Sequence, residues 1–345
     1  MPPLIAITPG DPAGIGPEIV AKAFRDTPEL LRGCFVAGDP AVIRRAAHCL
    51  AGPGQTPLPV LQLAQPGDAH QAPPRCVPVW PLPGAVPLAA DALPAWGQVS
   101  AHAGRLAADS VRWAAQAALR GEVAALVTAP LHKEALGAAG EPFPGHTELL
   151  QAEAAAFLGR AVAEVPVRMM LANRELRVVL VSIHVALRAA IAAVTPGNVL
   201  QTLRITDAAL TPVLGRRPRI AVAGLNPHAG EGGLFGPEET DAIAPAIAAA
   251  RGEGIDATGP LPPDTVFMRA RQGAFDVVVA MYHDQGLIPV KYLGLDHGVN
   301  VTLGLPLVRT SPDHGTAFDI AGTGQADPSS LVEAIAMARQ LVAGG

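Results

Sequence analysis

Three apolar segments of the chain each lead to a histidine. VVLVSIH ends at His184, IAVAGLNPH at His228 and VVVAMYH at His283. Short runs rich in valine and isoleucine are typical of buried strands, and ligands of open α/β sheets bind beyond the carboxyl ends of the strands. Three imidazoles at one such edge would hold a divalent transition metal and leave coordination positions open for water or substrate. The sequence therefore predicts a catalytic metal site; this donor set favours zinc, with cobalt or magnesium as alternatives.

The opposing interpretation is that each histidine is an ordinary loop residue, as a lone histidine at a strand end more often is. The spacing between the three histidines matches no compact metal-binding motif, so they can meet only through the fold. Their shared position after three apolar strands is what favours a common site.

Further polar residues accompany these segments. In FPGHTELL, His146 and Thr147 precede an apolar helical run, where N-capping alone would explain Thr147. Asp264 stands alone in the proline-rich GPLPPDTVF, and an ordinary turn would explain it. Lys291, Asn300 and Arg309 follow His283 in the sequence and are candidates to bind a phosphate or carboxylate. Simple solvent exposure would also explain them, but Lys291 and Arg309 stand among apolar residues.

The elements that must position these residues alternate between strand and helix. We expect strands at 4–8, 34–39, 75–80, 123–130, 167–173, 176–184, 219–228 and 275–283. We expect helices at 97–122, 146–160, 186–210, 237–253 and 329–343. This alternation predicts an α/β fold with a largely parallel sheet and a few antiparallel strands. A length of 345 residues favours two domains.

Composition excludes several classes of function. A formal net charge of −5 argues against nucleic acid as the main partner, and no run of about 18 apolar residues predicts a membrane span. The three cysteines form no CxxC pair, which favours a reducing compartment. The opening MPPLIAITPGDPAG lacks the features of a signal peptide, so we expect a cytoplasmic enzyme.

Eight blocks of the sequence resemble the 4-hydroxythreonine-4-phosphate dehydrogenases of pyridoxal phosphate biosynthesis. They run in order from residue 8 to residue 322: TPGDPAGIGPE, TAPLHKEAL, PGHTE, SIHVALR, GLNPHAGEGG, GPLPPDT, YHDQGL and VNVTLGLPLVRTSPDHGTAFDIAG. The resemblance implies two α/β/α domains similar to isocitrate and isopropylmalate dehydrogenases, with the active site in the interdomain cleft at a homodimer interface. We expect a cofactor-side domain at 1–135 plus 310–345 and a metal, substrate and dimerisation domain at 136–309.

The resemblance also implies roles for individual residues. The metal ligands of the family fall on His184, His228 and His283, with His283 supplied by the other subunit. Asp264 and Asp284 match acidic residues beside the site, which would hold the substrate amine or orient a ligand imidazole. The family's substrate contacts fall on His146, Thr147, Lys291, Asn300 and Arg309. The general base stays open between Lys291, Asp264 and a metal-bound water.

The nicotinamide cofactor is expected at HGTAFDIAGTGQADP, which is similar to the adenosine-binding loop of isopropylmalate dehydrogenases. The residues implied are His314, Gly315, Thr316 and Asp319. A carboxylate at Asp319 would accept the ribose hydroxyls and repel a 2′-phosphate, which favours NAD over NADP. Phe318 departs from the proline of those relatives, and GDPAGIGPEIV lacks the spacing of a GxGxxG fingerprint.

The activity implied is NAD(P)-dependent oxidation of 4-phosphooxy-L-threonine at its 3-hydroxyl. The β-keto acid product would decarboxylate to 3-amino-2-oxopropyl phosphate, a precursor of pyridoxal 5′-phosphate. A sister dehydrogenase acting on another phosphorylated four-carbon acid, such as phosphothreonate, is the nearer alternative. A metal-dependent hydrolase, which would use the three histidines to generate hydroxide without a nicotinamide, is the more distant one.

Overall fold

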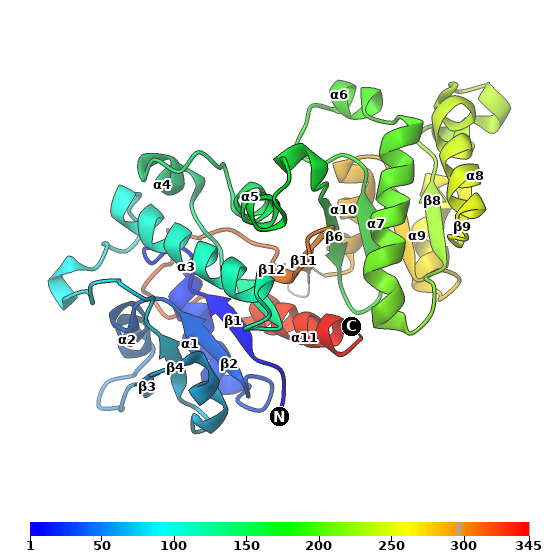
Figure 1. The fold of residues 1–345 in the computed structure, drawn as a ribbon. Helices are drawn as coiled ribbons and strands as arrows, with labels where there is room; N and C mark the ends of the chain where they lie inside the picture. Colours follow the sequence, from blue (N-terminus) through cyan, green and yellow to red (C-terminus); the bar gives the residue numbers. More distant parts are fainter. Residues whose placement is uncertain (295–297, 345) are drawn as a thin grey trace. The chain divides into compact units, whose positions relative to one another are not determined.

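A computed structural model describes residues 1–294 and 298–344 of the chain (Figure 1). The chain forms two compact units, one of Met1–Pro166 with Leu305–Val342 and one built on Val167–Gly304. The expected boundaries were at 135/136 and 309/310, so the segment 136–166 lies in the first unit rather than the second.

The first unit is built on six strands that pair only in parallel among the described residues. From one edge inward they are β3 (Val60–Gln62), β4 (Val77–Trp80), β2 (Cys34–Ala37), β1 (Ile5–Thr8), β5 (Ala125–Thr128) and β12 (Val308–Pro312). The loop after β1 leads to one helix layer and the loop after β5 to the other. Loops that diverge in this way mark the position where α/β sheets bind ligands.

Helices cover both faces of this sheet. They are α1 (Gly16–Asp26), α2 (Pro40–Cys49), α3 (Ala101–Leu119), α4 (Lys133–Ala138), α5 (His146–Leu158) and α11 (Ser329–Ala343). Three short 3₁₀ turns accompany them: η1 (Pro66–Gln71), η2 (Ala90–Ala92) and η3 (Val162–Glu164).

The core of the first unit explains why 136–166 belongs to it. Strand residues Phe35 and Leu126 pack with Val111 of α3, and all three are fully buried. Leu149 and Leu150 of α5 enter the same cluster with at most 1% exposure. Burying a leucine side chain contributes about 1.5–3 kcal/mol, so α5 is anchored in this core.

The second unit has a mixed sheet. Its strands, in spatial order, are β11 (Val299–Leu303), β6 (Arg168–Ala172), β7 (Arg177–Leu180), β10 (Val277–Ala280), β8 (Ile220–Ala223) and β9 (Ala257–Leu261). β6 is antiparallel to both neighbours, and the remaining pairs are parallel. The prediction of an α/β fold with a mostly parallel mixed sheet is confirmed.

The helical segments of this unit are α6 (Leu187–Ala192), α7 (Pro196–Leu214), η4 (Pro227–Gly233), η5 (Glu239–Ile243), α8 (Ala244–Gly252), α9 (Pro263–Arg271) and α10 (His283–Tyr292). The single helix expected at 186–210 is two helices. The Thr195 hydroxyl accepts a hydrogen bond from Asn198 N at 3.2 Å, and Pro196 occupies the first turn of α7. A capping side chain followed by proline begins a new helix.

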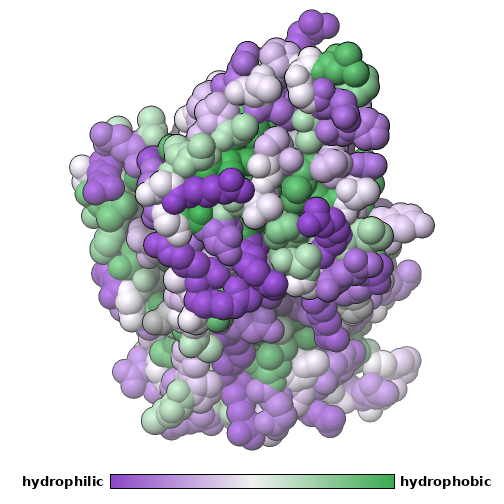
Figure 2. Space-filling model, turned by 90° about the vertical axis from the view of Figure 1, so that its right-hand side faces the viewer, coloured by the Kyte–Doolittle hydropathy of each residue, from purple (hydrophilic) through white to green (hydrophobic). Residues whose placement is uncertain are grey.

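Apolar residues of β7, β10 and β8 form the core of the second unit with α9 and α10. Figure 2 shows the side on which α7, α8 and β9 lie in Figure 1; hydrophilic residues cover most of it, with apolar residues in patches between them. Such scattered apolar surface is normal. Over the described ranges, no helix is both long and apolar enough to cross a bilayer.

Candidate functional site

Two of the three predicted metal ligands lie side by side in the second unit. The ring centroids of His184 and His283 are 5.6 Å apart, with 48° between the ring planes. This proximity follows from the sheet, because β7 and β10 are parallel neighbours and each histidine follows the carboxyl end of its strand. Both imidazoles line a pocket of about 270 Å³, together with Ile183, Val185, Leu187, Ala190, Tyr282 and Asp284.

Residues directly after His283 fix the turn that carries it. β10 ends at Ala280, and His283 is the first residue of α10. Gln285 accepts a hydrogen bond from Met281 N and donates one to Gly224 O, both at 2.7 Å, which ties this turn to the end of β8. A Cβ on Gly286 would lie 2.5 Å from a methyl group of Leu180, so only glycine lets α10 approach β7 so closely.

Asp284 orients the His283 ring. Its Oδ1 lies 2.7 Å from Nδ1 of His283. A carboxylate at that distance favours the proton on Nδ1 and leaves the Nε2 lone pair for a ligand. The side chain of Asp284 is 72% exposed, so it is not part of the core. The arrangement matches one of the two roles that the resemblance implied for this residue.

His228 lies in a loop of unusual backbone conformation. Residues 228–232 all have positive φ angles, and three of them, His228, Ala229 and Glu231, are not glycine. The left-handed conformation costs a non-glycine residue roughly 1–2 kcal/mol. Strain of this kind persists where the surroundings impose it and is concentrated at functional sites.

Glu239 packs against this loop, so close to Gly230 that a Cβ there would lie 2.7 Å from its Oε2. It is 3% exposed and accepts hydrogen bonds from the backbone N atoms of Leu225 and Asn226 at 2.7 Å and from the Asn226 side chain at 2.9 Å. A buried carboxylate is stable only with such donors. Sequence reasoning missed Glu239, although an acidic residue a few positions after a glycine-rich loop was a usable signal.

The chain does not bring the three histidines together by itself. Among the described residues, no group of three histidine, cysteine or acidic side chains is close enough to hold one metal ion. The resemblance assigned His283 to the partner subunit, yet it lies beside His184 of the same chain. The reason is topological, since these two histidines follow adjacent parallel strands.

Three further predicted residues belong to the second unit. Asp264 lies exposed in the first turn of α9, and Lys291 is half-buried in the last turn of α10. Asn300 is half-buried on β11, where it pairs with Leu171 of β6. All three stand at the ends of elements or on the sheet, outside the apolar core.

The first unit brings His146 and Arg309 into electrostatic contact. Arg309 is 6% exposed, and its Nε and Nη2 donate to the Thr128 hydroxyl at 3.2 and 2.8 Å. Burial lowers the pKa of Arg309 to about 10, so it stays charged at neutral pH. His146 and Thr147 begin α5; Gly145, not Thr147, is the N-cap residue.

His146 is held neutral. Burial, and secondly the charge of Arg309, lower its pKa well below the usual range. Its Nε2 is buried without a hydrogen-bond partner in the part of the chain that the structure describes. An unsatisfied buried ring nitrogen costs free energy unless a ligand engages it, which is what a substrate-binding role requires.

The predicted cofactor loop begins directly after β12. His314, Gly315 and Asp319 are exposed, and Thr316 is half-buried. The Thr316 carbonyl accepts a hydrogen bond from Ile15 N at 3.0 Å.

Phe318, the departure from the relatives' pattern, stacks on His132 with ring centroids 4.7 Å apart.

Asp11 is fully buried after β1, and its pKa is raised by burial. Asp11 N donates to Pro130 O at 2.9 Å. Asp11 and His132 therefore follow β1 and β5, at the point where the loops diverge, and sequence reasoning missed both.

Comparisons with known proteins agree with this architecture. Residues 31–338 match the family model described as pyridoxal phosphate biosynthetic protein PdxA. The chain is 52% identical to a 4-hydroxythreonine-4-phosphate dehydrogenase of Beijerinckia indica, covering 98% of this chain and 94% of that protein. It is 47% identical to a D-threonate 4-phosphate dehydrogenase of Salmonella typhimurium, covering 98% of both.

A solved structure supports the same relationship. The crystal structure of a 4-hydroxythreonine-4-phosphate dehydrogenase from Klebsiella pneumoniae superposes with a TM-score of 0.87 at 43% identity, covering 99% of this chain and 98% of that one. The match extends over both units rather than one. The chain therefore belongs to the PdxA family of pyridoxal phosphate biosynthetic proteins.

Proposed function

We propose that this chain is a nicotinamide-dependent dehydrogenase that oxidises 4-phosphooxy-L-threonine at its 3-hydroxyl. The β-keto acid formed would decarboxylate to 3-amino-2-oxopropyl phosphate, a step towards pyridoxal 5′-phosphate. The observation that carries the proposal is the pair formed by His184 and His283, 5.6 Å apart at the ends of two parallel strands, in a family of such dehydrogenases. We place the enzyme in the cytoplasm, as its sequence predicted.

The residues present fit a divalent metal, with zinc favoured and cobalt or magnesium as alternatives. His184 and His283 supply two imidazole nitrogen atoms, and Asp284 orients the second ring. His228 is the third donor in this proposal. When bound there, the metal would supply Lewis acidity towards the oxygen atoms of the substrate.

A second copy of the chain would complete this site. No third ligand accompanies His184 and His283 among the described residues, and apolar side chains surround their pocket. Val185 and Leu187 are 54% and 57% exposed, and Ile288 and Tyr292 on α10 are 63% and 89% exposed. Val185 and Leu187 line the pocket itself, and exposed apolar side chains beside a site mark an interface. We therefore propose a homodimer in which His228 comes from the partner subunit.

The chain's other residues bind and orient the substrate in this proposal. Arg309, charged at neutral pH, balances an anionic phosphate or carboxylate. Neutral His146 donates or accepts a hydrogen bond at Nε2. Lys291 and Asn300 are the contacts from the second unit, with Thr147 beside His146. Fixing the substrate in this way raises the effective concentration of the reacting groups.

The general base stays open between Lys291 and Asp264, with metal-bound water as the third candidate. Asp264 is also the candidate to hold the substrate amine. Asp284 acts through His283 and is therefore a positioning residue. Comparing the pH profiles of activity for Lys291→Met and Asp264→Asn separates the first two candidates, because loss of the base removes the acidic limb of the profile.

Residues 314–319 would hold the nicotinamide cofactor, which would supply the hydride acceptor for the oxidation. Exposed Asp319 is the residue proposed to bind the adenosine ribose, which favours NAD over NADP. We also propose that the two units adopt a fold similar to that of isocitrate and isopropylmalate dehydrogenases, as the sequence resemblance implies.

One assay tests the function. Purified protein, NAD⁺ and 4-phosphooxy-L-threonine should produce the near-ultraviolet absorbance of reduced nicotinamide together with carbon dioxide. Similar identity to D-threonate 4-phosphate dehydrogenases makes that substrate the second candidate, so the same assay is run with it. The larger kcat/KM identifies the substrate. Phosphate release without nicotinamide reduction would instead identify the hydrolase.

A further inference from the structure

One buried ion pair of the first unit reaches the predicted cofactor loop. Glu18 is fully buried and Lys22 is 8% exposed, one turn apart on α1. The Lys22 Nζ lies 3.5 Å from Glu18 Oε1. Replacing a buried ion pair by apolar residues is often neutral or stabilising, so stability alone does not account for this pair.

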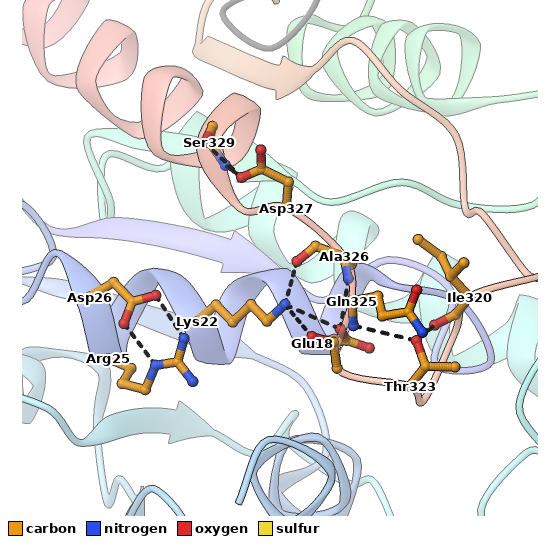
Figure 3. Close-up of polar contacts among 11 residues, drawn as sticks. Glu18, Lys22, Arg25, Asp26, Ile320, Thr323, Gln325, Ala326, Asp327 and Ser329 are labelled. Carbon is orange, nitrogen blue, oxygen red and sulfur yellow. Dashed lines mark hydrogen bonds and ion pairs between the residues drawn. The ribbon is translucent and has the colours of Figure 1, made fainter. Parts of the chain in front are cut away.

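Both side chains bind the backbone of the C-terminal part of this loop (Figure 3). Lys22 Nζ donates to the carbonyl oxygens of Gly324, at 2.8 Å, and of Ala326. Glu18 Oε1 accepts a hydrogen bond from Ala326 N at 3.0 Å. The pair therefore satisfies three polar groups of a segment without regular secondary structure, which would otherwise be costly to bury.

Hydrogen bonds within successive turns extend this restraint to the backbone around Asp319. Thr323 N and its hydroxyl donate to Ile320 O at 3.2 and 2.6 Å, and Gln325 N donates to the Thr323 hydroxyl at 3.3 Å. Ile320 N donates to Ala317 O at 3.2 Å. Exposed Asp319 lies inside this last turn, so its backbone is fixed although its carboxylate faces outward.

The same helix holds the other end of the loop. Ile15, at the N-terminus of α1, donates from its backbone to Thr316 O at 3.0 Å. Ile15 and Lys22 are about 10 Å apart along a helix of standard rise. One rigid element therefore brackets residues 316–326 on both sides of Asp319.

We propose that Glu18 and Lys22 are positioning residues that hold the 316–326 segment in the shape that presents Asp319 to the adenosine ribose of the nicotinamide cofactor. This inference rests on the proposed function. Neither side chain needs to touch the cofactor. Their effect is to keep the loop in its binding shape before the cofactor arrives, which removes an ordering cost from binding.

The test compares Lys22→Met and Glu18→Gln with Arg25→Gln. Arg25 lies on the same helix and forms an exposed ion pair with Asp26, also drawn in Figure 3, that does not touch the loop. If Lys22→Met leaves a tenth of the molecules with a competent loop, the NAD⁺ dissociation constant rises about tenfold. Glu18→Gln should give a smaller rise because the amide oxygen still accepts from Ala326, and Arg25→Gln should give none.

Two readouts separate positioning from general damage. Calorimetric titration with NAD⁺ gives the dissociation constant, and hydrogen exchange in the protein without cofactor should be faster at 316–326 in Lys22→Met than in Arg25→Gln. At saturating NAD⁺, kcat and the KM for the phosphorylated substrate should stay within about twofold of the unaltered enzyme. Lys22→Arg, which keeps a cation able to reach both carbonyls, should restore part of the affinity.

The outcomes are distinguishable. Unchanged NAD⁺ affinity in Lys22→Met and Glu18→Gln would overturn the positioning role and leave the proposed function intact. A fall in kcat without a change in affinity would also overturn it. Failure of the unaltered protein to bind NAD⁺ would overturn the proposed function and this inference together. If Lys22→Met does not fold, Glu18→Gln carries the same test, since its side chain keeps its shape.

Discussion

The two units differ in the burial of the polar side chains that bear on the proposed site. In the first unit, Glu18, Lys22 and Arg309 are buried and hydrogen-bonded within the unit. In the second unit, His184 and His228 are exposed, and the His228 loop has a strained backbone. A buried polar group must find its partners inside the protein, whereas an exposed imidazole is accessible to a ligand from solution. The first unit is therefore a preformed frame, whereas the second presents the histidines that we propose to bind a metal together with a second chain.

The sharpest test of this comparison is to remove one of the two paired histidines of the second unit. His184→Ala or His283→Ala should lower activity by at least about 100-fold, since ligand loss should exceed the 10–100-fold effects seen for residues that only orient ligands. Elemental analysis of the purified variants should show loss of the metal. His48→Ala, which removes an exposed histidine of α2, is the matched control and should keep both activity and metal. Full metal content in His184→Ala would remove that residue from the site.

A smaller effect is expected from Asp284→Asn. The asparagine keeps the shape but not the charge that holds Nδ1 of His283. We expect metal affinity to fall about 10–100-fold, measured by competition with a chelating dye. Affinity equal to that of the unaltered protein would mean that the contact is only a surface interaction.

The next prediction concerns the frame of the first unit. Asp319→Ser removes the carboxylate that would repel a 2′-phosphate. Relief of about 1.4 kcal/mol of repulsion corresponds to a tenfold rise in the ratio of kcat/KM for NADP⁺ to that for NAD⁺. Steady-state kinetics with both cofactors gives this ratio. An unchanged ratio would place the ribose elsewhere.

The smallest effect is on stability. His146 has a folded-state pKa below its ordinary value of about 6.5, so below that pH the unfolded chain binds a proton that the folded chain does not. The free energy of unfolding should therefore fall as pH drops from about 7, by at most about 1.4 kcal/mol per pH unit from this group. Urea unfolding from pH 7 to pH 5 should show a shallower fall for His146→Gln. Equal slopes would mean that His146 is not buried in neutral form.

Local patterns in the sequence predicted much of the architecture. The apolar runs before His184 and His283 contained the strands, because valine-rich segments between helices leave few alternatives. The exact strand ends were not predictable: β10 ends at Ala280, since Gln285 closes the next turn onto Met281. That closure depends on a side-chain contact rather than on a pattern of hydrophobicity.

The features that the sequence did not predict depend on contacts between distant parts of the chain. Lys22 reaches Gly324 and Ala326, about 300 residues further along, and no periodicity signals such a contact. The left-handed run at 228–232 was indicated only by its glycines, and the sequence did not show that the buried carboxylate of Glu239 binds the backbone just before it. The strand-end pattern and the motif resemblance predicted the site residues, but neither indicated the residues that pack around them.

The central claim is that a second copy of the chain completes the histidine site, and subunit mixing tests it most directly. With His184 and His283 from one chain and His228 from its partner, a mixture of His184→Ala and His228→Ala dimers should regain roughly a quarter of full activity after random exchange, because each mixed dimer then has one intact site. A mixture of His184→Ala and His283→Ala should regain none. Recovery only in the second mixture would assign His283 to the partner instead. No recovery in either, with mixed dimers present, would contradict a shared site.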